Sequence, residues 1–136
     1  MIIDADGAIL GRLASRVAKR ILSGEDMVIV NAEKAVVSGD PKVIAKVYLT
    51  KRQRGDPLHG PFYPRYPDKI VWRTIRGMMP YKKARGIDAM KRLKIHVGCP
   101  EQFKNAAEKV IKSKTELRCK YTTIRDISKI IGAKVE

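Results

Sequence analysis

The stretch that decides the fold is MIIDADGAILGRLASRVAKRILSGEDMVIV, residues 1–30. It begins with the apolar run Met1–Ile3 and ends with a second one, Met27–Val30. Between them, apolar residues recur at helical spacing over Leu10–Ile21, and Gly24 follows where a glycine commonly ends a helix. Because neither strand alternates apolar with polar residues, we expect a parallel strand–helix–strand unit in a sheet covered on both faces.

Gly7 and Gly11 flank the turn between the first strand and this helix. A phosphate-binding P-loop needs four residues between its glycines, followed by Lys and Ser or Thr. Here three residues separate the glycines and Arg12-Leu13 follows. The dinucleotide fingerprint G-x-G-x-x-G is also absent, so we interpret the turn as structural.

Further helices follow from local signals. Asp40 is a candidate N-cap before Pro41, for a helix whose expected apolar face contains Val43, Ile44 and Val47. Asp68 is a second candidate N-cap. In the helix that it starts, Lys69, Arg73 and Arg76 share one stripe, and the expected apolar stripe consists of Val71, Ile75 and Met78.

The remaining chain continues to alternate helix and strand. We expect a helix over Lys82–Leu93 with Ala84, Ile87 and Met90 inward, and then a strand over Lys94–Val97. The final part predicts an amphipathic helix over Glu101–Lys114, an extended segment over Leu117–Tyr121 and a helix over Thr123–Ile131 closed by Gly132. The resulting expectation is one domain, residues 1–136, with a C-terminal helical tail from residue 115.

Charge is unevenly distributed along the chain. The net charge is +15, and residues 51–94 hold 13 Lys and Arg against 3 Asp, a net of +10. Residues 1–40 hold 5 Lys and Arg against 6 Asp and Glu, a net of −1. A field of one sign beside a nearly neutral scaffold favours a polyanionic partner, nucleic acid above all.

The loop over Gly55–Pro67 has four of the seven prolines, and it places aromatic residues among basic ones. Prolines stiffen a loop and reduce the entropy lost on binding. Aromatic rings in such a loop can stack on bases, although Phe62 and Tyr63 can instead pin the loop to its own core, which we favour for Phe62. We expect Arg73 and Arg76 to act through phosphate contact and not through the fold. The predicted RNA-binding residues are Lys51, Arg52, Arg54, His59, Arg65, Tyr66, Lys69, Arg73, Arg76, Lys82, Lys83, Arg85, Lys91 and Arg92.

Other chemistry receives little support from the sequence. No apolar run approaches a membrane span, and the N-terminus lacks the pattern of a signal peptide. Cys99 and Cys119 are expected to be free, buried thiols in a reducing cytosol, although a disulfide remains open. His59 and His96 are the only histidines, so we expect no catalytic residues, no metal site and no cofactor.

Several blocks resemble one known family. Ile75-Arg76-Gly77-Met78-Met79-Pro80, Gly86, and Leu93-Lys94-Ile95-His96-Val97-Gly98-Cys99-Pro100 are similar to the signature of the universal large-subunit ribosomal protein L-thirteen family. The blocks Asp4-Ala5-Asp6-Gly7, Leu10–Ser15, Val30–Lys34 and Gly60-Pro61-Phe62 resemble the same family, in the same order. The start at the first strand and the ending Tyr-Thr-Thr-Ile-Arg-Asp-Ile-Ser-Lys-Ile-Ile-Gly look archaeal.

The resemblance implies a three-layer α/β/α fold around a small, mainly parallel sheet, with a basic loop-helix insertion. It also implies a structural constituent of the large ribosomal subunit that binds large-subunit ribosomal RNA, contacts neighbouring ribosomal proteins and acts early in assembly in the cytoplasm. No small-molecule substrate and no membrane are expected. The rival interpretation is a nucleotide-dependent enzyme on a small α/β fold.

Overall fold

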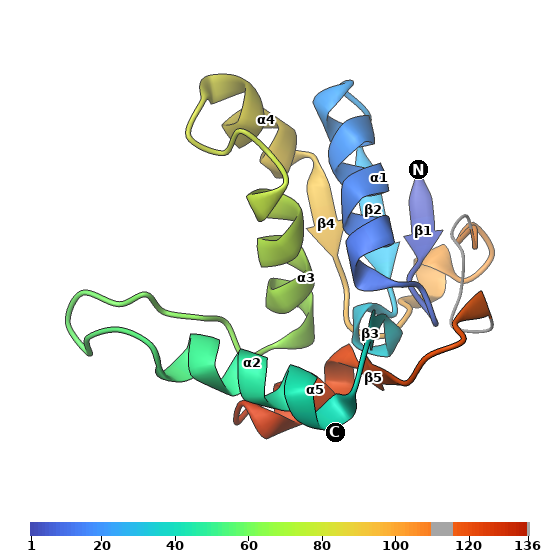
Figure 1. Cartoon of the computed structure of the whole chain (residues 1–136). Helices are drawn as coiled ribbons and strands as arrows, with labels where there is room; N and C mark the ends of the chain where they lie inside the picture. Colours follow the sequence, from blue (N-terminus) through green and yellow to red (C-terminus); the bar gives the residue numbers. More distant parts are fainter. Residues whose placement is uncertain (110–115, 136) are drawn as a thin grey trace.

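A three-stranded parallel sheet forms the centre of the computed structural model, which describes residues 1–109 and 116–135 (Figure 1). Its strands are β1 (Ile2–Asp4), β2 (Met27–Val30) and β4 (Leu93–Ile95), in the order β1-β2-β4. The register aligns Ile3 with Ile29, and Ile29 with Ile95. The predicted α/β class with a small, mainly parallel sheet is therefore confirmed.

Three helices cover one face of this sheet: α1 (Leu10–Leu22), α3 (Pro67–Gly77) and α4 (Ala84–Lys91) (Figure 1). The apolar stripe of α1 is fully or nearly fully buried, as its spacing predicted. Side chains alternate across a strand, so Met27 and Ile29 of β2 point into this core, whereas Val28 is only half-buried.

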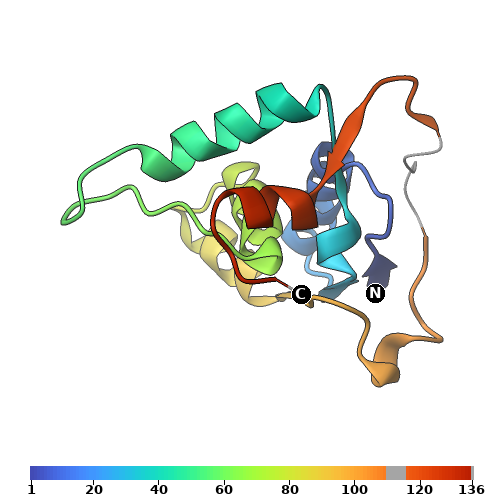
Figure 2. The same cartoon turned by 90° about the horizontal axis from the view of Figure 1, so that it is seen from below.

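A second group of elements lies at the carboxyl ends of the parallel strands (Figures 1 and 2). It contains the short helix η1 (Ala32–Lys34), β3 (Val36–Ser38), α2 (Pro41–Gln53), β5 (Tyr121–Thr123) and α5 (Ile124–Ile130). β3 pairs with β5 in an antiparallel ladder, so the last strand begins later than the predicted segment over Leu117–Tyr121. Ile124 and Ile127 of α5 are fully buried in the common core, so the C-terminal tail is an integral part of the fold.

One of the two predicted helix caps is correct. Asp40 caps α2, since its Oδ1 accepts a hydrogen bond of 2.9 Å from the backbone N–H of Lys42. Thr123 similarly caps α5. The prediction of Asp68 as a cap is wrong: α3 begins one residue earlier at Pro67, a residue suited to the first helical position.

Some predicted apolar faces are also wrong. Val43 and Val47 of α2 are exposed, and the buried residues of this helix are Ile44 and Tyr48. These lie at i and i+4, so α2 touches the body along one narrow line. Met78 and Ile87 are exposed, Ala84 is exposed as well, and α4 instead buries Gly86 and Ala89.

The helix predicted over Glu101–Lys114 is absent from the described part of that segment. Residues Glu101–Phe103 form the short helix η2, and Glu108 then pairs with Ile3 at the edge of the sheet. The Glu108 N–H donates to the Ile2 carbonyl at 3.1 Å, which requires extended backbone there and excludes a helix. Residues 110–114 of the prediction lie outside the described residues.

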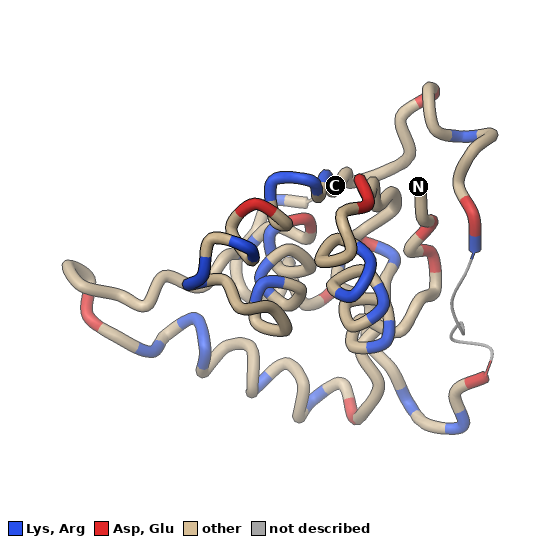
Figure 3. The backbone as a smooth tube through the Cα atoms, turned by 90° about the horizontal axis from the view of Figure 1, so that it is seen from above, with Lys and Arg blue, Asp and Glu red and all other residues tan. Residues whose placement is uncertain are grey.

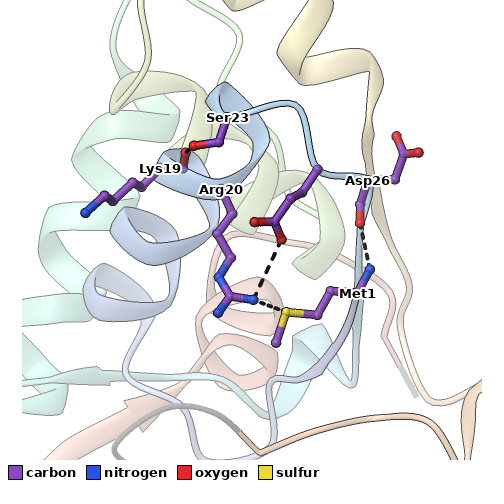
Figure 4. A network of polar contacts seen from close by, with 6 residues as sticks. Met1, Lys19, Arg20, Ser23 and Asp26 are labelled. Atoms are coloured by element: carbon purple, nitrogen blue, oxygen red, sulfur yellow. Dashed lines mark hydrogen bonds and ion pairs between the residues drawn. The ribbon is translucent and has the colours of Figure 1, made fainter.

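The first residue is tied to the turn between α1 and β2 (Figure 4). The ammonium group of Met1 donates to the Asp26 carbonyl at 2.8 Å, and Arg20 contacts the Met1 thioether. The Arg20 guanidinium also lies 3.8 Å from the Glu25 carboxylate. These contacts hold the start of β1 next to the end of α1, as the parallel pairing of β1 with β2 requires.

A basic arm connects this body to a projecting loop. We use that name for residues 41–77, which comprise α2, the connecting loop over residues 54–66 and α3. The loop projects away from the rest of the molecule (Figure 2). In the described residues no helix has the length and hydropathy needed to cross a membrane.

Candidate nucleic-acid interface

Helices α1 to α4 contain almost all their charge as Lys and Arg (Figure 3). Together they hold thirteen cations and two acids, Asp68 and Asp88. The acids of the first forty residues all lie outside α1, which itself has four cations and no acid. The sequence predicts that residues 1–40 form a near-neutral scaffold separate from the basic stretch. In the folded protein this separation does not hold, because the cationic helix α1 packs directly on α3 and α4.

A groove lies between the end of α2, the loop and α3. It has a volume of about 420 Å³, and Lys51, Arg54 and Arg73 contribute its cations. It adjoins a second hollow of about 440 Å³, with which it shares Lys51 and Tyr63 and which Arg12 of α1 also lines. Among the described residues that line the two hollows there is no Asp or Glu, so the groove can accept an anion without competition from a carboxylate.

Aromatic rings hold two cations of this groove, Lys51 and Arg73, in place. The Lys51 ammonium lies 5.0 Å from the Tyr48 ring centroid and 5.9 Å from that of Tyr63. The Arg73 guanidinium lies 4.8 Å from the Tyr63 centroid, and its Nη1 donates a hydrogen bond of 3.0 Å to the Phe62 carbonyl. Such cation–π contacts restrict the side chains before any ligand arrives.

Tyr63 is the residue that fixes the loop to the body. Its ring packs edge-on against Tyr48 with centroids 6.0 Å apart. Burial raises the pKa of Tyr63 to about 12, with a further increase from Tyr48 and an opposing effect from Arg73. Burial also raises the pKa of Tyr48. Both phenols are therefore neutral at physiological pH.

The interpretation of Phe62 as a core anchor is wrong, because its side chain is 65% exposed. At the tip of the loop Leu58 is 83% exposed. The backbone groups of Asp56 and Gly60 form two mutual hydrogen bonds of 3.1 and 2.9 Å that close the tip. The pKa of Asp56 is lowered by a hydrogen bond from the Leu58 N–H and a smaller contribution from His59, whose Nδ1 lies 3.2 Å away. The tip is thus a closed turn that presents apolar side chains to solvent.

The predicted residues of the interface fall into two groups. The members of the larger group are exposed on α2, the loop, α3 or around the start of α4: Lys51, Arg54, His59, Arg65, Tyr66, Lys69, Lys82, Lys83 and Arg85. The half-buried Arg52 lies with them at the end of α2. The members of this group therefore lie on the basic arm and around the start of α4.

The other group has partners within the chain. Arg73 holds the Phe62 carbonyl, and Arg76 lies 4.6 Å from the Tyr81 ring centroid and 5.7 Å from that of Trp72. Lys91 pairs with Asp88 at 3.0 Å. The guanidinium of Arg92 donates to the Ile21 carbonyl at the end of α1, with a length of 3.3 Å. These cations therefore also stabilise the fold through contacts within the chain. The sequence did not predict this for Arg73 and Arg76, which were expected to act only through phosphate contact.

Sequence reasoning missed Arg12, Tyr48, Trp72 and Tyr81. Arg12 was assigned to the near-neutral part of the chain, although the acid-free helix around it was a usable signal. Helical spacing could have indicated two contacts, since Tyr48 precedes Lys51 by three residues in α2 and Trp72 precedes Arg76 by four in α3. The contact between Tyr48 and Tyr63 forms only when α2 and the loop come together, and no spacing along the chain indicates it.

The structure also bears on the state of the two cysteines and on metal binding. Cys99 and Cys119 are free, as predicted, but Cys99 is half-buried and Cys119 exposed, contrary to the expected burial. Within residues 1–109 and 116–135 no group of His, Cys, Asp and Glu is arranged to hold a metal ion.

Comparison with known proteins places these features in context. The family model described as Ribosomal protein L13 matches residues 1–102. The protein named large ribosomal subunit protein uL13 from Methanococcoides burtonii is 48% identical, over 98% of both chains. Those of Methanosarcina barkeri and Methanocaldococcus jannaschii are 49% and 47% identical, again over 98% of each chain.

Proposed function

Because the chain belongs to the ribosomal protein L13 family, we propose that it binds large-subunit ribosomal RNA through the groove between α1, α2 and α3. It is a ribosomal protein of the large subunit in its archaeal form, and it is not an enzyme. Family membership therefore excludes the rival interpretation of a nucleotide-dependent enzyme.

The observation that supports this surface is the set of four cations without a carboxylate. Arg12, Lys51, Arg54 and Arg73 come from different elements and line two adjoining hollows. An ordinary solvated surface would mix both signs of charge. Cations in this arrangement neutralise phosphates and release condensed counterions, which supplies sequence-independent affinity. The aromatic contacts of Lys51 and Arg73 give the groove a fixed shape, which suits folded RNA recognised by geometry.

The mechanism is therefore binding alone. The closed, proline-rich loop projects into a junction or groove of the RNA, and the sheet and its helices hold the loop and the cationic groove in register. The exposed Leu58 and Phe62 at the loop would meet RNA bases or neighbouring ribosomal proteins. Such a role places the protein on the ribosome in the cytoplasm.

The salt dependence of RNA binding tests the proposal. The full chain is titrated into a transcribed large-subunit RNA fragment, and the affinity is measured by filter binding between 50 and 200 mM salt. For about 6–10 phosphate contacts we expect a loss of roughly 10³–10⁵ in affinity over that range, on duplex-DNA scaling. An affinity that hardly changes would overturn the proposal.

A pair of double variants locates the surface. Lys51→Glu with Arg54→Glu reverses two groove cations, and the matched control, Lys94→Glu with Lys104→Glu, makes the same charge change outside the four helices. We expect the groove variant to lower the salt slope by about 2, since each phosphate-binding cation contributes about 1. Equal losses in both variants, with unchanged circular dichroism, would mean that only total charge matters.

We also propose that the protein acts early in assembly of the subunit. The groove and the loop both belong to this chain alone, so binding should need no other ribosomal protein. The expected outcome is tight binding to protein-free large-subunit RNA. A requirement for a second ribosomal protein would contradict an early role.

A further inference from the structure

A separate pocket lies between the end of α3, the Pro80 turn and α4. It has a volume of about 350 Å³ and is lined by Trp72, Arg76, Tyr81, Ile87, Met90 and Lys91. A volume of this size is at the lower end of the range for sites that hold a small organic group. Most of this lining is apolar or aromatic, unlike the cationic groove.

The pocket keeps apolar groups in contact with solvent. Tyr81 is 40% exposed, and Ile87, which its helical spacing placed inward, is exposed as well. These side chains lie on two elements that meet at the pocket, so they form one concave surface and not scattered exposed residues. A contiguous surface of this kind marks an interaction site.

Arg76 gives the pocket a flat, positively charged wall. Its guanidinium lies 4.6 Å from the Tyr81 ring centroid and 5.7 Å from that of Trp72. No Asp or Glu is among the described residues that line the pocket. The acid on α4, Asp88, is paired with Lys91 at 3.0 Å. The charge of Arg76 is therefore not neutralised by a carboxylate of the pocket.

The turn that holds Tyr81 is set before a ligand arrives. The Lys83 N–H donates to the Pro80 carbonyl at 2.9 Å, and the Gly86 N–H donates to the Lys83 carbonyl at 3.0 Å. Gly86 lets α4 approach the Pro80 carbonyl, because a Cβ at this position would collide with it. A preorganised wall loses little entropy on binding.

We propose that this pocket accepts a single unpaired nucleobase of RNA, an inference that rests on the proposed RNA-binding function. A base offers apolar faces to Trp72 and Tyr81 and can stack on the guanidinium plane of Arg76. Its flanking phosphates would reach Lys82 and Lys83, which are exposed on the turn beside the pocket. This combination of flat rings with uncompensated positive charge selects a nucleotide over the apolar side chain of a protein partner, which has no charge to match.

Trp72 makes the inference directly measurable, because it is the only tryptophan of the chain. The full chain is titrated with a short single-stranded oligoadenylate and, separately, with heparin, a polyanion without bases. We expect the oligoadenylate to quench Trp72 emission and heparin to bind with little quenching. An equal response to the two polyanions, or oligoadenylate binding without quenching, would overturn the proposal.

Substitutions at Tyr81 and a matched tyrosine separate stacking from charge. Tyr81→Ala should weaken oligoadenylate binding by about 5- to 100-fold with heparin affinity unchanged, and Tyr81→Phe should retain the wild-type affinity. The control is Tyr121→Ala on β5, since Tyr121 is 41% exposed and remote in the sequence from this pocket. Equal losses for Tyr81→Ala and Tyr121→Ala would also overturn the proposal.

Different experiments test which group occupies the pocket and whether the protein binds ribosomal RNA at all. If an acidic peptide with one phenylalanine quenches Trp72 and the oligoadenylate does not, the occupant is a protein side chain and the inference fails. Salt-dependent binding of the ribosomal RNA fragment would then still stand. Loss of that salt dependence, in contrast, would remove the proposed function itself.

Discussion

The β1–α1–β2 unit and the loop of the basic arm, residues 54–66, differ in the burial of their apolar side chains. In the unit, the inward residues Leu13, Ile21 and Ile29 are completely buried. In the arm, Leu58 and Phe62 are mostly exposed, although the loop around them is closed by its own hydrogen bonds. A chain that covers apolar groups in one region and presents them on an ordered loop in another has a partner surface to meet there.

The same comparison applies to charge. Aromatic rings and one backbone carbonyl hold Arg73 and Arg76 of the arm, and within residues 1–109 and 116–135 neither guanidinium forms an ion pair with a carboxylate. Aromatic contacts restrict a cation without neutralising it. The arm therefore retains a positive field that salt bridges would have reduced.

The largest expected difference between the regions is in stability. Leu13→Ala should lower the free energy of unfolding by about 2–5 kcal/mol, because it leaves a cavity in a fully buried site. Leu58→Ala removes the same atoms from a side chain that is already in solvent, so we expect a change within about 0.5 kcal/mol. Urea unfolding of the full chain measures both, and similar losses would show that the loop is part of the core.

The next largest effect on stability is expected where the turn at Pro80 packs against α4. Gly86→Ala should lower the free energy of unfolding by about 1–3 kcal/mol, because the new Cβ meets the backbone carbonyl of Pro80, which cannot move without shifting the turn. Gly11→Ala on α1 is the matched control. No atom lies within 4 Å of its added Cβ, so that variant should gain about 0.5–1 kcal/mol from helix propensity. A harmless Gly86→Ala would mean that the turn is not tightly packed on α4.

A smaller effect is expected where the loop is attached to α3. Arg73→Gln removes the contact with the Tyr63 ring and weakens the bond to the Phe62 carbonyl, so it should cost about 1 kcal/mol. The control is Lys69→Gln, which removes an exposed charge one turn earlier on the same helix. Thermal unfolding and the rate of proteolysis within the loop measure the effect. If the two variants behave alike, Arg73 does not anchor the loop.

These regions also differ in how far the sequence could predict them. The β1–α1–β2 unit follows from local periodicity, since uninterrupted apolar strands and an amphipathic helix each indicate their own buried face. Predictions failed where burial depends on the position of a distant element. Val43 and Val47 are apolar at helical spacing, yet Tyr48 packs against Tyr63 and determines which side of α2 faces inward.

The candidate site shows the same limit. The basic residues of the arm were evident from composition, but Arg12 joins the groove only because α1 packs beside α3. The helix predicted from Glu101 failed for a related reason, since Glu108 pairs with β1 and forms hydrogen bonds with backbone groups of Ile2 and Asp4 on that edge strand. Hydrogen bonds between segments about a hundred residues apart leave no periodic signal in either segment.

The smallest expected effect is the titration of Tyr63, which reports whether the loop stays closed over the body. Burial raises its pKa to about 12, so its folded-state pKa lies above the value of about 10 expected in the unfolded chain. The unfolded state then loses its phenolic proton first as the pH rises. Stability contributed by this group is fully present below pH 10 and is lost between pH 10 and about 12.

Absorbance of tyrosinate during an alkaline titration measures this difference. One component of the titration should ionise near pH 12 and disappear in Tyr63→Phe. The same variant should match the wild type in stability below pH 10 and lose less stability above it, because its ring has no proton to release. If all tyrosines of the folded protein ionise together near pH 10, Tyr63 is open to water and the loop is not attached through it. The groove cations that this ring positions would then be free to move, and the fixed shape inferred for the cationic groove would be wrong.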